Sequence, residues 1–191
     1  AVIALVCFLF VPILGFLYWR YFRFYRNPPR NPPSGDNIVS PADGIVVYDK
    51  TVEPHEEVIV IKRGLHASVN DITRSDLSSR KVLIGIFMSP FDVHYNRAPL
   101  SGRVEFIHRH SARGRYLPMM SLHLRTLLKW PPYHAGSAHV LQNERLVTKI
   151  RGTFQDQPLS CYVIQIAGRS VSRIDSFVTE GEQVEKGDIF G

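Results

Sequence analysis

Apolar side chains fill residues 1–19 and are interrupted only by Pro12 and Gly15. At ~1.5 Å of rise per residue, a helix of this length just crosses a ~30 Å hydrocarbon layer. Aromatic residues and arginines then alternate up to Arg26, which is the pattern of an aromatic belt and a cationic collar where a helix leaves the bilayer. The pattern therefore predicts a transmembrane and juxtamembrane helix over residues 1–26.

A cleaved secretory signal is the alternative interpretation of this run. It is disfavoured because the cationic residues follow the apolar segment and no small-residue cleavage site comes after it. The positive-inside rule then predicts that the rest of the chain lies on the cytoplasmic side of the cell membrane. Next comes Asn27-Pro-Pro-Arg-Asn-Pro-Pro-Ser-Gly-Asp36, a composition typical of a stiff spacer. We therefore expect a proline-rich linker over residues 27–36 and a folded domain over residues 37–191.

Beyond the linker, apolar segments of strand length alternate with turn signals such as Asp43-Gly44 and Ser101-Gly102. Runs of this length, bounded by glycine and polar residues, predict β-strands. The predicted strands cover residues 38–48, 57–62, 81–88, 103–108, 146–150, 159–167 and 171–178. Many short strands at this spacing are typical of a sandwich or a barrel.

Residues 118–130 carry a helical pattern instead. The apolar side chains in and next to this segment lie on one approximate face: Leu117, Met120, Leu124, Leu127 and Leu128. Two interpretations of this face stay open. The helix either packs it on the domain or lays it into a membrane interface.

Two segments share a pattern in which proline stands three residues before glycine and the chain then enters a strand. They are Ser40-Pro-Ala-Asp-Gly-Ile-Val46 and Arg97-Ala-Pro-Leu-Ser-Gly-Arg-Val104. A third segment, residues 178–191, has paired glycine turns around Val184, whose side chain we expect to point inward. Together these patterns are typical of the barrel-sandwich hybrid of biotinyl and lipoyl carriers. The predicted fold class is therefore mainly β, with a barrel-sandwich-hybrid-like β domain after an N-terminal transmembrane helix.

Composition narrows the classes of function. The net charge is +6, but Arg20, Arg23, Arg26 and Arg30 supply four of these charges before the first acidic residue. Little basic excess remains for the folded domain, which argues against a nucleic-acid-binding face. The two cysteines lie far apart in the sequence, so no disulfide framework is expected and a reducing compartment fits.

The candidate chemistry lies where the predicted strand over residues 81–88 ends. Pro90 stops the strand because proline has no backbone N–H to donate. Asp92, His94, Asn96 and Arg97 then follow within six residues. Imidazole and carboxylate groups at the mouth of a buried strand favour proton-transfer chemistry. The residues alone leave a second interpretation open, in which a solvated histidine stands beside a weak surface ion pair.

Several blocks of the sequence, taken in order, resemble phosphatidylserine decarboxylases, most closely their short, archaeal-type branch. The blocks are Ser-Pro-Ala-Asp-Gly at 40–44, Met-Ser-Pro-Phe-Asp-Val-His-Tyr-Asn-Arg-Ala-Pro at 88–99, Asn-Glu-Arg at 143–145, Gln-Ile-Ala-Gly at 165–168 and the glycine-rich tail. The resemblance extends from about the linker to the last residue. It is poorest over residues 109–138, which look like an insertion or a variable loop.

The resemblance implies an enzyme that is made as a proenzyme. In this family a serine of a Gly-Ser pair attacks its own preceding peptide bond, an ester forms, the chain is cleaved, and the serine becomes an N-terminal pyruvoyl group. The family assigns an aspartate and a histidine to this step, and by motif these catalytic residues are Asp43 and His94. A neutral imidazole is a good base for a serine hydroxyl, and a carboxylate can fix its tautomer.

The family's Gly-Ser pair lies a few residues beyond Gly187-Asp-Ile-Phe-Gly191, the last residues of this sequence. The resemblance therefore implies that the chain is the β subunit. The pyruvoyl group would then stand on the N-terminus of a separate α subunit.

The implied reaction is the decarboxylation of phosphatidylserine, or of an archaeal ether analogue, to phosphatidylethanolamine and CO2. The pyruvoyl group would be the electron sink, and His94 would return a proton. Tyr95, Asn96 and Arg97 are the expected substrate-binding residues. Arg97 suits a lipid phosphate because its guanidinium forms paired hydrogen bonds, and pairing with Asp92 is the alternative. Some members have a second histidine at this place, so the resemblance leaves open whether His94 performs both proton transfers.

Expected partners are the α subunit, the phospholipid, the membrane and a second αβ unit in a homodimer, but not nucleic acid. No metal is expected, because no further ligand joins His108 and His110 on their strand face. One alternative is a membrane-anchored lipoyl/biotinyl-like barrel that acts as a non-enzymatic, membrane-fusion-type adaptor, but the sequence lacks the long heptad hairpin this requires. Another is a lipoyl or biotin carrier with Lys50 at a hairpin tip.

Overall fold

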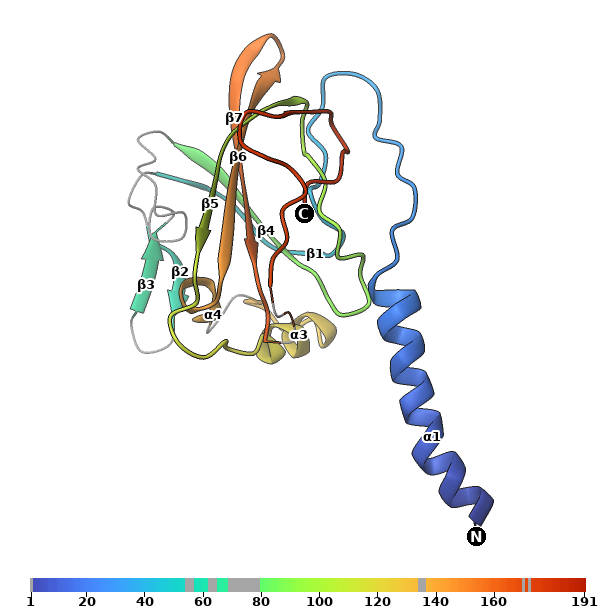
Figure 1. Ribbon diagram of the computed structural model, residues 1–191. Helices are drawn as coiled ribbons and strands as arrows, with labels where there is room; N and C mark the ends of the chain where they lie inside the picture. The colour runs from blue at the N-terminus through green and yellow to red at the C-terminus, as the bar shows by residue number, and fades with distance from the viewer. Residues whose placement is uncertain are drawn as a thin grey trace.

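The computed structural model describes residues 2–53, 57–61, 65–68, 80–133, 137–169, 171 and 173–191. The domain is built mainly from strands, as the sequence predicts (Figure 1). The strands are β1 (Ile45–Val52), β2 (Glu57–Ile61), β3 (Leu65–Ser68), β4 (Lys81–Phe87), β5 (Gly102–His110), β6 (Arg145–Phe154), β7 (Gln157–Ile166) and β8 (Gln183–Val184). The helices are α1 (Val2–Tyr18), η1 (Trp19–Phe24), α3 (Met120–Leu127) and α4 (His139–Gln142).

The largest sheet is antiparallel and has the strand order β7-β6-β5-β8. A tight hairpin joins β6 to β7 through Gln155 and Asp156, which both have positive φ angles. This backbone matches the twist of the two strands. β1 pairs with β4, and β2 pairs with β3, in separate antiparallel ribbons.

The main apolar core lies between the large sheet and the C-terminal segment. Its buried members come from β5, β6, β7 and β8, from the loop before β5 and from the segments on either side of β8. They are Ala98, Leu100, Val104, Ile150, Val163, Val178, Val184 and Phe190. Val184 is 3% exposed, so the prediction that it points inward is confirmed. The last residues are therefore fixed against the sheet by packing as well as by hydrogen bonds.

Two strand predictions need correction. The strand expected over residues 38–48 begins only at Ile45, because Pro41 and Gly44 shape a loop before it. No strand forms over residues 171 and 173–178. The apolar alternation there reflects burial of Ile174 and Val178, while the Ile174 carbonyl accepts a hydrogen bond from an arginine side chain, that of Arg109, rather than from a neighbouring strand.

The apolar N-terminal run forms a helix, α1, that projects away from the β domain (Figure 1). The helical turns continue through η1, which carries aromatic residues and arginines. Within the described part of the chain, no helix is both long enough and apolar enough to cross a membrane. The expected transmembrane span is therefore not confirmed.

Candidate active site

The two motif blocks meet because of strand pairing. Ile45 at the start of β1 lies opposite Phe87 at the end of β4, so the loop before β1 and the loop after β4 leave the same end of the ribbon. Gly44 permits this approach. Its φ is +153°, and a Cβ atom there would lie 2.4 Å from the Phe87 carbonyl oxygen, which no other residue could accommodate without a shift of the backbone.

Hydrogen bonds then fasten the two loops together. The Pro41 carbonyl accepts from the Arg97 backbone N–H at 2.8 Å and from the Asn96 side-chain amide at 3.3 Å. The Val39 N–H donates to the Pro99 carbonyl at 2.9 Å. Asp43 and His94 therefore stand on loops that hold a fixed relation to each other.

The C-terminal segment joins these loops as a third element. It runs antiparallel to the loop that carries His94, with Arg97 paired to Ile189. The Phe190 N–H donates to the Asn96 carbonyl at 3.0 Å, and the Asn96 N–H donates to the Gly191 carbonyl at 2.6 Å. In this register Gly191, the end of the described chain, lies opposite Tyr95 and so one residue from His94.

Asn96 organises the junction. Its side chain is 8% exposed; its amide N–H group donates to Pro41, and its Oδ1 accepts from Gln165 Nε2 at 2.7 Å. The sequence predicts Asn96 as a substrate-binding residue, whereas in the structure its side chain bonds to protein groups. This bridging role follows from contacts between distant segments, so no local sequence signal could have shown it.

Gln165 brings β7 to the end of the chain. Its Oε1 atom is buried and has no hydrogen-bond partner among the described residues. A Cβ atom at Gly191 would lie 2.6 Å from Gln165 Nε2 and 3.1 Å from Oε1. An unused buried acceptor therefore stands beside the last residue.

His94 is half-buried, and its tautomer can be assigned. Nδ1 lies 2.9 Å from the Asp92 carbonyl oxygen, and a carbonyl can only accept, so Nδ1 carries the proton in the neutral ring. Nε2 then keeps its lone pair, and no described residue forms a hydrogen bond with it. This arrangement leaves one basic nitrogen for proton transfer.

The surroundings of His94 keep the ring neutral. Burial lowers its pKa, the Asp92 carbonyl and charge oppose this effect in part, and the nearby Arg26 and Arg20 charges lower the pKa further. The imidazole is therefore unprotonated near neutral pH, as a general base must be.

Residues of the N-terminal helical segment pack on the His94 loop. The Phe24 ring stacks on the His94 ring, with centroids 4.0 Å apart and planes 28° apart. Trp19 Nε1 donates to the Pro90 carbonyl at 3.1 Å, and the Arg26 guanidinium donates to the Phe91 carbonyl at 2.8 Å. Sequence reasoning assigned these residues to the membrane surface and missed their contacts with the His94 loop.

Asp43 has a partner other than His94. Its carboxylate forms an ion pair with Arg30 of the linker, and no hydrogen bond joins Asp43 to His94 in the part of the chain that the structure describes. The structure thus brings the two predicted loops together but gives their side chains different partners. The tautomer of His94 is fixed by the Asp92 carbonyl instead of by a carboxylate side chain.

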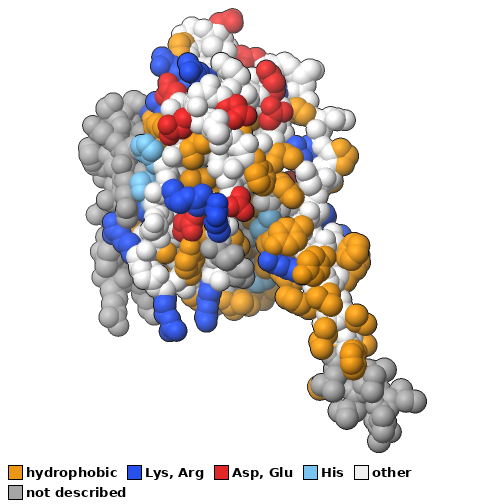
Figure 2. Space-filling model, in the orientation of Figure 1, with side chains coloured by type: hydrophobic (Ala, Val, Ile, Leu, Met, Phe, Trp, Pro, Cys, Tyr) orange, Lys and Arg blue, Asp and Glu red, His pale blue; other side chains and the backbone are white. Residues whose placement is uncertain are grey.

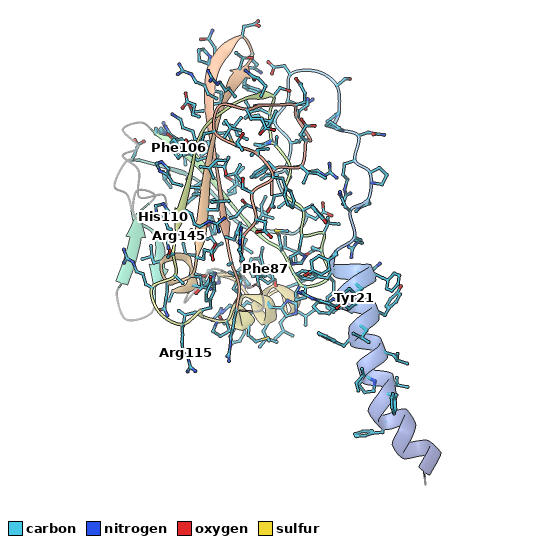
Figure 3. The ribbon with its side chains drawn as sticks, in the orientation of Figure 1. Tyr21, Phe87, Phe106, His110, Arg115 and Arg145 are labelled. Carbon is cyan, nitrogen blue, oxygen red and sulfur yellow. The ribbon has the colours of Figure 1, made fainter. Side chains whose placement is uncertain are left out.

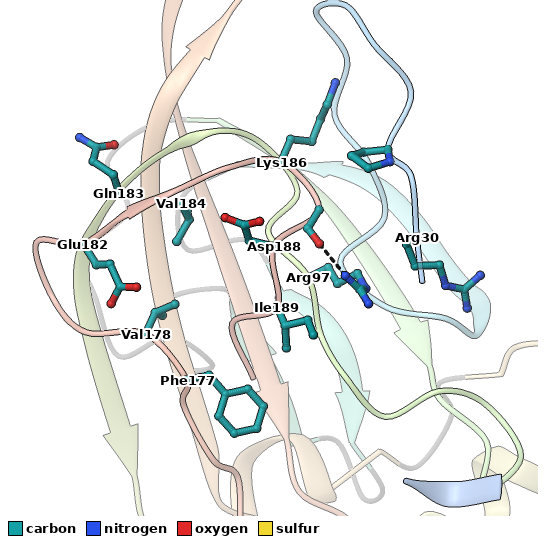
Figure 4. Close-up of a pocket in the computed structure, with 12 residues that line it drawn as sticks. Arg30, Arg97, Phe177, Val178, Glu182, Gln183, Val184, Lys186, Asp188 and Ile189 are labelled. Carbon is teal, nitrogen blue, oxygen red and sulfur yellow. Dashed lines mark hydrogen bonds between the residues drawn. The ribbon is translucent and has the colours of Figure 1, made fainter. Parts of the chain in front are cut away.

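Arg97 also has partners within the protein. Its guanidinium donates to the Gly187 carbonyl at 2.8 Å, as Figure 4 shows, and to Asn27 Oδ1 at 2.7 Å. Asp92 Oδ2 instead accepts from the Ser89 backbone N–H, so the alternative Asp92–Arg97 pair does not form.

Two cavities adjoin Arg97. The smaller, of about 180 Å³, is lined by Tyr95, Asp43 and Arg30 among others. The larger, of about 460 Å³, is lined by Arg30, Lys186 and residues of the C-terminal turns (Figure 4). Cationic side chains thus border both cavities beside the predicted site.

Lys50 does not stand at a hairpin tip. It lies within β1, opposite Leu83 of β4. A carrier lysine must project from an exposed turn to reach its partner enzymes, so the lipoyl or biotin carrier loses its candidate residue.

Comparison with known proteins identifies the same family that the sequence blocks at the site resemble. A family model described as phosphatidylserine decarboxylase matches residues 17–191. A "Putative archaetidylserine decarboxylase proenzyme" of Methanopyrus kandleri is 34% identical over 170 residues, which cover 88% of this chain and 63% of the relative. The protein of the same name from Methanothermobacter thermautotrophicus is 36% identical, with the same coverage.

A "Phosphatidylserine decarboxylase proenzyme" of Carboxydothermus hydrogenoformans is 31% identical over 169 residues, which cover 88% of this chain and 61% of the relative. The chain therefore spans less than two thirds of the length of these three curated relatives. With the motif blocks assembled in one place and a family match over most of its length, this chain belongs to the phosphatidylserine decarboxylase family.

Proposed function

We propose that this chain is the larger part of a decarboxylase that acts on a phospholipid with a phosphoserine head group and releases CO2. The family match and the names of the relatives support this reaction class. Both phosphatidylserine and archaetidylserine decarboxylases occur among those names, so the proposed substrate is the head group that the two lipids share. The phosphatidylserine form would yield phosphatidylethanolamine.

We further propose that the enzyme matures by self-cleavage just beyond Gly191. The observation that carries this proposal is the antiparallel pairing of the C-terminal segment with the His94 loop. Arg97 faces Ile189, and Asn96 exchanges hydrogen bonds with Phe190 and Gly191. In a longer chain that keeps this register, the next residue would face His94. The relatives are named proenzymes and are longer than this chain, which supports the same view.

His94 is the proposed base for this cleavage. Its free Nε2 would take the proton of the attacking serine hydroxyl, while the Asp92 carbonyl holds Nδ1–H and so stabilises the charged ring. Asp43 is the proposed second catalytic residue, since its loop is bonded to the His94 loop through Pro41. To act there, the Asp43 carboxylate must exchange its partner Arg30 for a reacting group.

The residues present fit a pyruvoyl group on a companion chain. The unpartnered Gln165 Oε1 beside Gly191 would accept a backbone N–H of an entering segment. When bound, the pyruvoyl group supplies an electron sink for the bond that releases CO2. His94 would hold or return a proton at Nε2, and the Phe24 ring would exclude water from one face of that imidazole.

Tyr95, Asn96 and Arg97 are proposed to serve the head group in different ways. Tyr95 and Arg97 line the cavity of about 180 Å³ next to Asp43 and are the proposed contacts. Asn96 would act by holding the loops in register, because its side chain is already bonded.

The remaining organisation is proposed from the family and the sequence. The chain would be the β subunit, the pyruvoyl group would stand on a separate α subunit, and two αβ units would form a homodimer. The domain, with the barrel-sandwich-hybrid arrangement expected from its half-motifs, would lie on the cytoplasmic side of the cell membrane. The linker over residues 27–36 would separate it from the N-terminal membrane segment.

The test is maturation of the full-length precursor with His94→Ala. We expect self-cleavage to slow by roughly 10²–10⁴-fold, the usual contribution of a general base, as measured by intact mass over time. His108→Ala, which changes an exposed histidine of β5, is the matched control and should cleave normally. Normal cleavage and normal turnover in the His94 variant would remove this residue from the mechanism.

A further inference from the structure

Helix α3 exposes its apolar face. Met120, Leu124, Leu127 and Leu128 share one side of the helix and are 48–67% exposed. Thr126 on the other side is 7% exposed, and its hydroxyl lies within hydrogen-bonding distance of the Leu122 and His123 carbonyls of the same helix. Leu122 is the apolar side chain of α3 that is buried, at 7% exposed. A helix that packed for burial alone would turn the larger apolar face toward the domain.

This orientation is fixed by the domain. The Asn143 side chain, 0% exposed, accepts from the Leu117 N–H at 2.7 Å and donates to the Leu117 and Ala167 carbonyls at 2.9 and 2.8 Å. His123 of α3 packs against Phe87 with ring centroids 5.9 Å apart. The buried Asn143 side chain therefore fixes which face of α3 points outward. Asn143 belongs to one of the family's sequence blocks.

The charged side chains of α3 and of the segments next to it in the sequence are all positive. Residues 106–143 contain no acidic residue, and neither do residues 1–35. The Arg125 guanidinium lies over the Trp130 ring, 5.1 Å from its centroid. Arg115 points away from the domain at this end (Figure 3). In Figure 2 no acidic side chain is visible in the lower part of the molecule, where α3 lies and α1 departs.

The exposed face and the N-terminal helix flank the His94 loop. Figure 1 shows α3 at the end of the domain from which α1 departs. Phe87, at the end of β4, contacts His123 of α3, and Phe24 of η1 stacks on His94 of the loop that follows β4. Phe91, on the loop itself, is 60% exposed. We define the α3 surface as the outward residues at this end: Phe91, Met120, Leu124, Leu127, Leu128 and Trp130.

We propose that the α3 surface docks onto an anionic lipid bilayer, with α3 lying in the plane of the interface. Apolar side chains with a cationic rim match the headgroup boundary of such a bilayer. The acidic residue next to this surface in the sequence, Asp92 beside Phe91, has its carboxylate bonded to the Ser89 backbone N–H. The position of the α3 surface beside the His94 loop would deliver a head group to the site without removing the lipid tails from the membrane. This last step rests on the proposed function, whereas the docking itself does not.

Trp130 offers a direct probe of docking. The chain has two tryptophans, so Trp19→Phe leaves Trp130 as the single fluorescent reporter in the full-length precursor. In vesicles of phosphatidylglycerol with brominated acyl chains, we expect Trp130 emission to be quenched and shifted to the blue. The matched control is Trp19→Phe with Trp130→Phe and Gln157→Trp, whose reporter stands on the distant β6–β7 hairpin and should not be quenched. Absence of quenching at Trp130, or equal quenching at both places, would overturn the proposal.

Charge placed in the face tests the link to catalysis. Leu127→Glu with Leu128→Glu should lower turnover of substrate in anionic vesicles by roughly tenfold, because two glutamates resist insertion beside anionic lipid. Turnover of short-chain substrate dispersed in detergent should stay unchanged. Val82→Glu with Ile84→Glu, at exposed positions of β4, is the matched control. Equal losses on both substrates would contradict the docking role.

The outcomes separate the two proposals. If brominated lipid quenches Trp130 emission but the protein decarboxylates phosphoserine lipid neither in vesicles nor in detergent, docking stands and the proposed function fails. If instead the α3 surface binds a second copy, sedimentation will show a dimer that the Leu127/Leu128 variant dissociates, with Trp130 unquenched by lipid. That result would replace the bilayer with a protein partner and refute the proposal.

Discussion

At the scale of single residues, the state of His94 is set by groups from two places in the chain, its own loop and residues 20–26. The Asp92 carbonyl fixes its tautomer, the Phe24 ring covers one face, and the Arg20 and Arg26 charges oppose its protonation. The sequence could identify His94, since its motif block is local and specific. It could not identify Phe24, because that contact joins residues seventy positions apart that share no pattern.

The pH dependence of self-cleavage should reveal the stacking. Burial lowers the pKa of His94, so the neutral base persists into mildly acidic solution and cleavage is lost only below that lowered pKa. Phe24→Ala would admit water to the ring and raise the pKa back toward its ordinary value. We therefore expect the acid limb of the rate profile to move to higher pH, with a several-fold slower reaction at mildly acidic pH.

Two further variants make this measurement specific. Phe24→Trp keeps an aromatic face over the imidazole and should preserve the wild-type profile. Phe22→Ala removes an exposed ring of η1 that stacks on Tyr18 instead and should also leave the profile in place. An unchanged acid limb in Phe24→Ala, or one moved to lower pH, would show that the ring does not set the pKa of His94.

At the scale of elements, the site forms where the loop before β1, the loop after β4 and the C-terminal segment meet. The sequence predicts the strands well where apolar runs are bounded by glycine and proline, as at β4 and β7. β6 runs on through Gly152 to Phe154, beyond the end predicted at residue 150. It fails at residues 171 and 173–178, where buried alternation occurs without a strand partner. The pairing of Arg97 with Ile189 could not be predicted, because register between distant segments is decided by packing.

Gly44 tests this arrangement at a single position. Gly44→Ala would place a methyl group 2.4 Å from the Phe87 carbonyl oxygen, so the loop before β1 must move away from β4. We expect a loss of roughly 1–3 kcal/mol in unfolding free energy, measured by chemical denaturation, together with slower self-cleavage of the precursor. Gly114→Ala is the matched control, since Gly114 also has a positive φ but its added Cβ would meet nothing. Equal effects of both variants would mean that strain in φ, and not the close approach, explains the loss.

At the scale of the whole molecule, the chain is polarised. The N-terminal helix and α3 lie toward one end, and the β6–β7 hairpin extends at the other, where the linker also arrives because Asp36 accepts a hydrogen bond from the Gln155 backbone N–H (Figure 1). The sequence predicts an apolar face on residues 118–130 and leaves open whether it packs inward or meets the membrane. Its outward orientation depends on the Asn143 side chain, which the helix itself does not encode.

Salt should separate the electrostatic part of docking from the apolar part. Surface attraction weakens as the screening length falls from ~10 Å at 0.1 M salt to ~3 Å at 1 M. We expect lipid quenching of Trp130 to decline over this range for the Trp19→Phe protein. Lys129 follows Leu128 at the C-terminal end of α3. With Arg125→Glu and Lys129→Glu added, quenching should be weak throughout and nearly independent of salt. If quenching in the Trp19→Phe protein does not change with salt concentration, docking depends on the apolar residues alone.

The ladder between the tail and the His94 loop has one more consequence. Each of its bonds, including those from Phe190 to Asn96 and from Asn96 to Gly191, joins residues that precede the proposed cut. Self-cleavage beyond Gly191, as proposed, would therefore break none of them. The new carboxyl end would stay held beside His94, so maturation would open one covalent bond and leave the hydrogen bonds around the site in place.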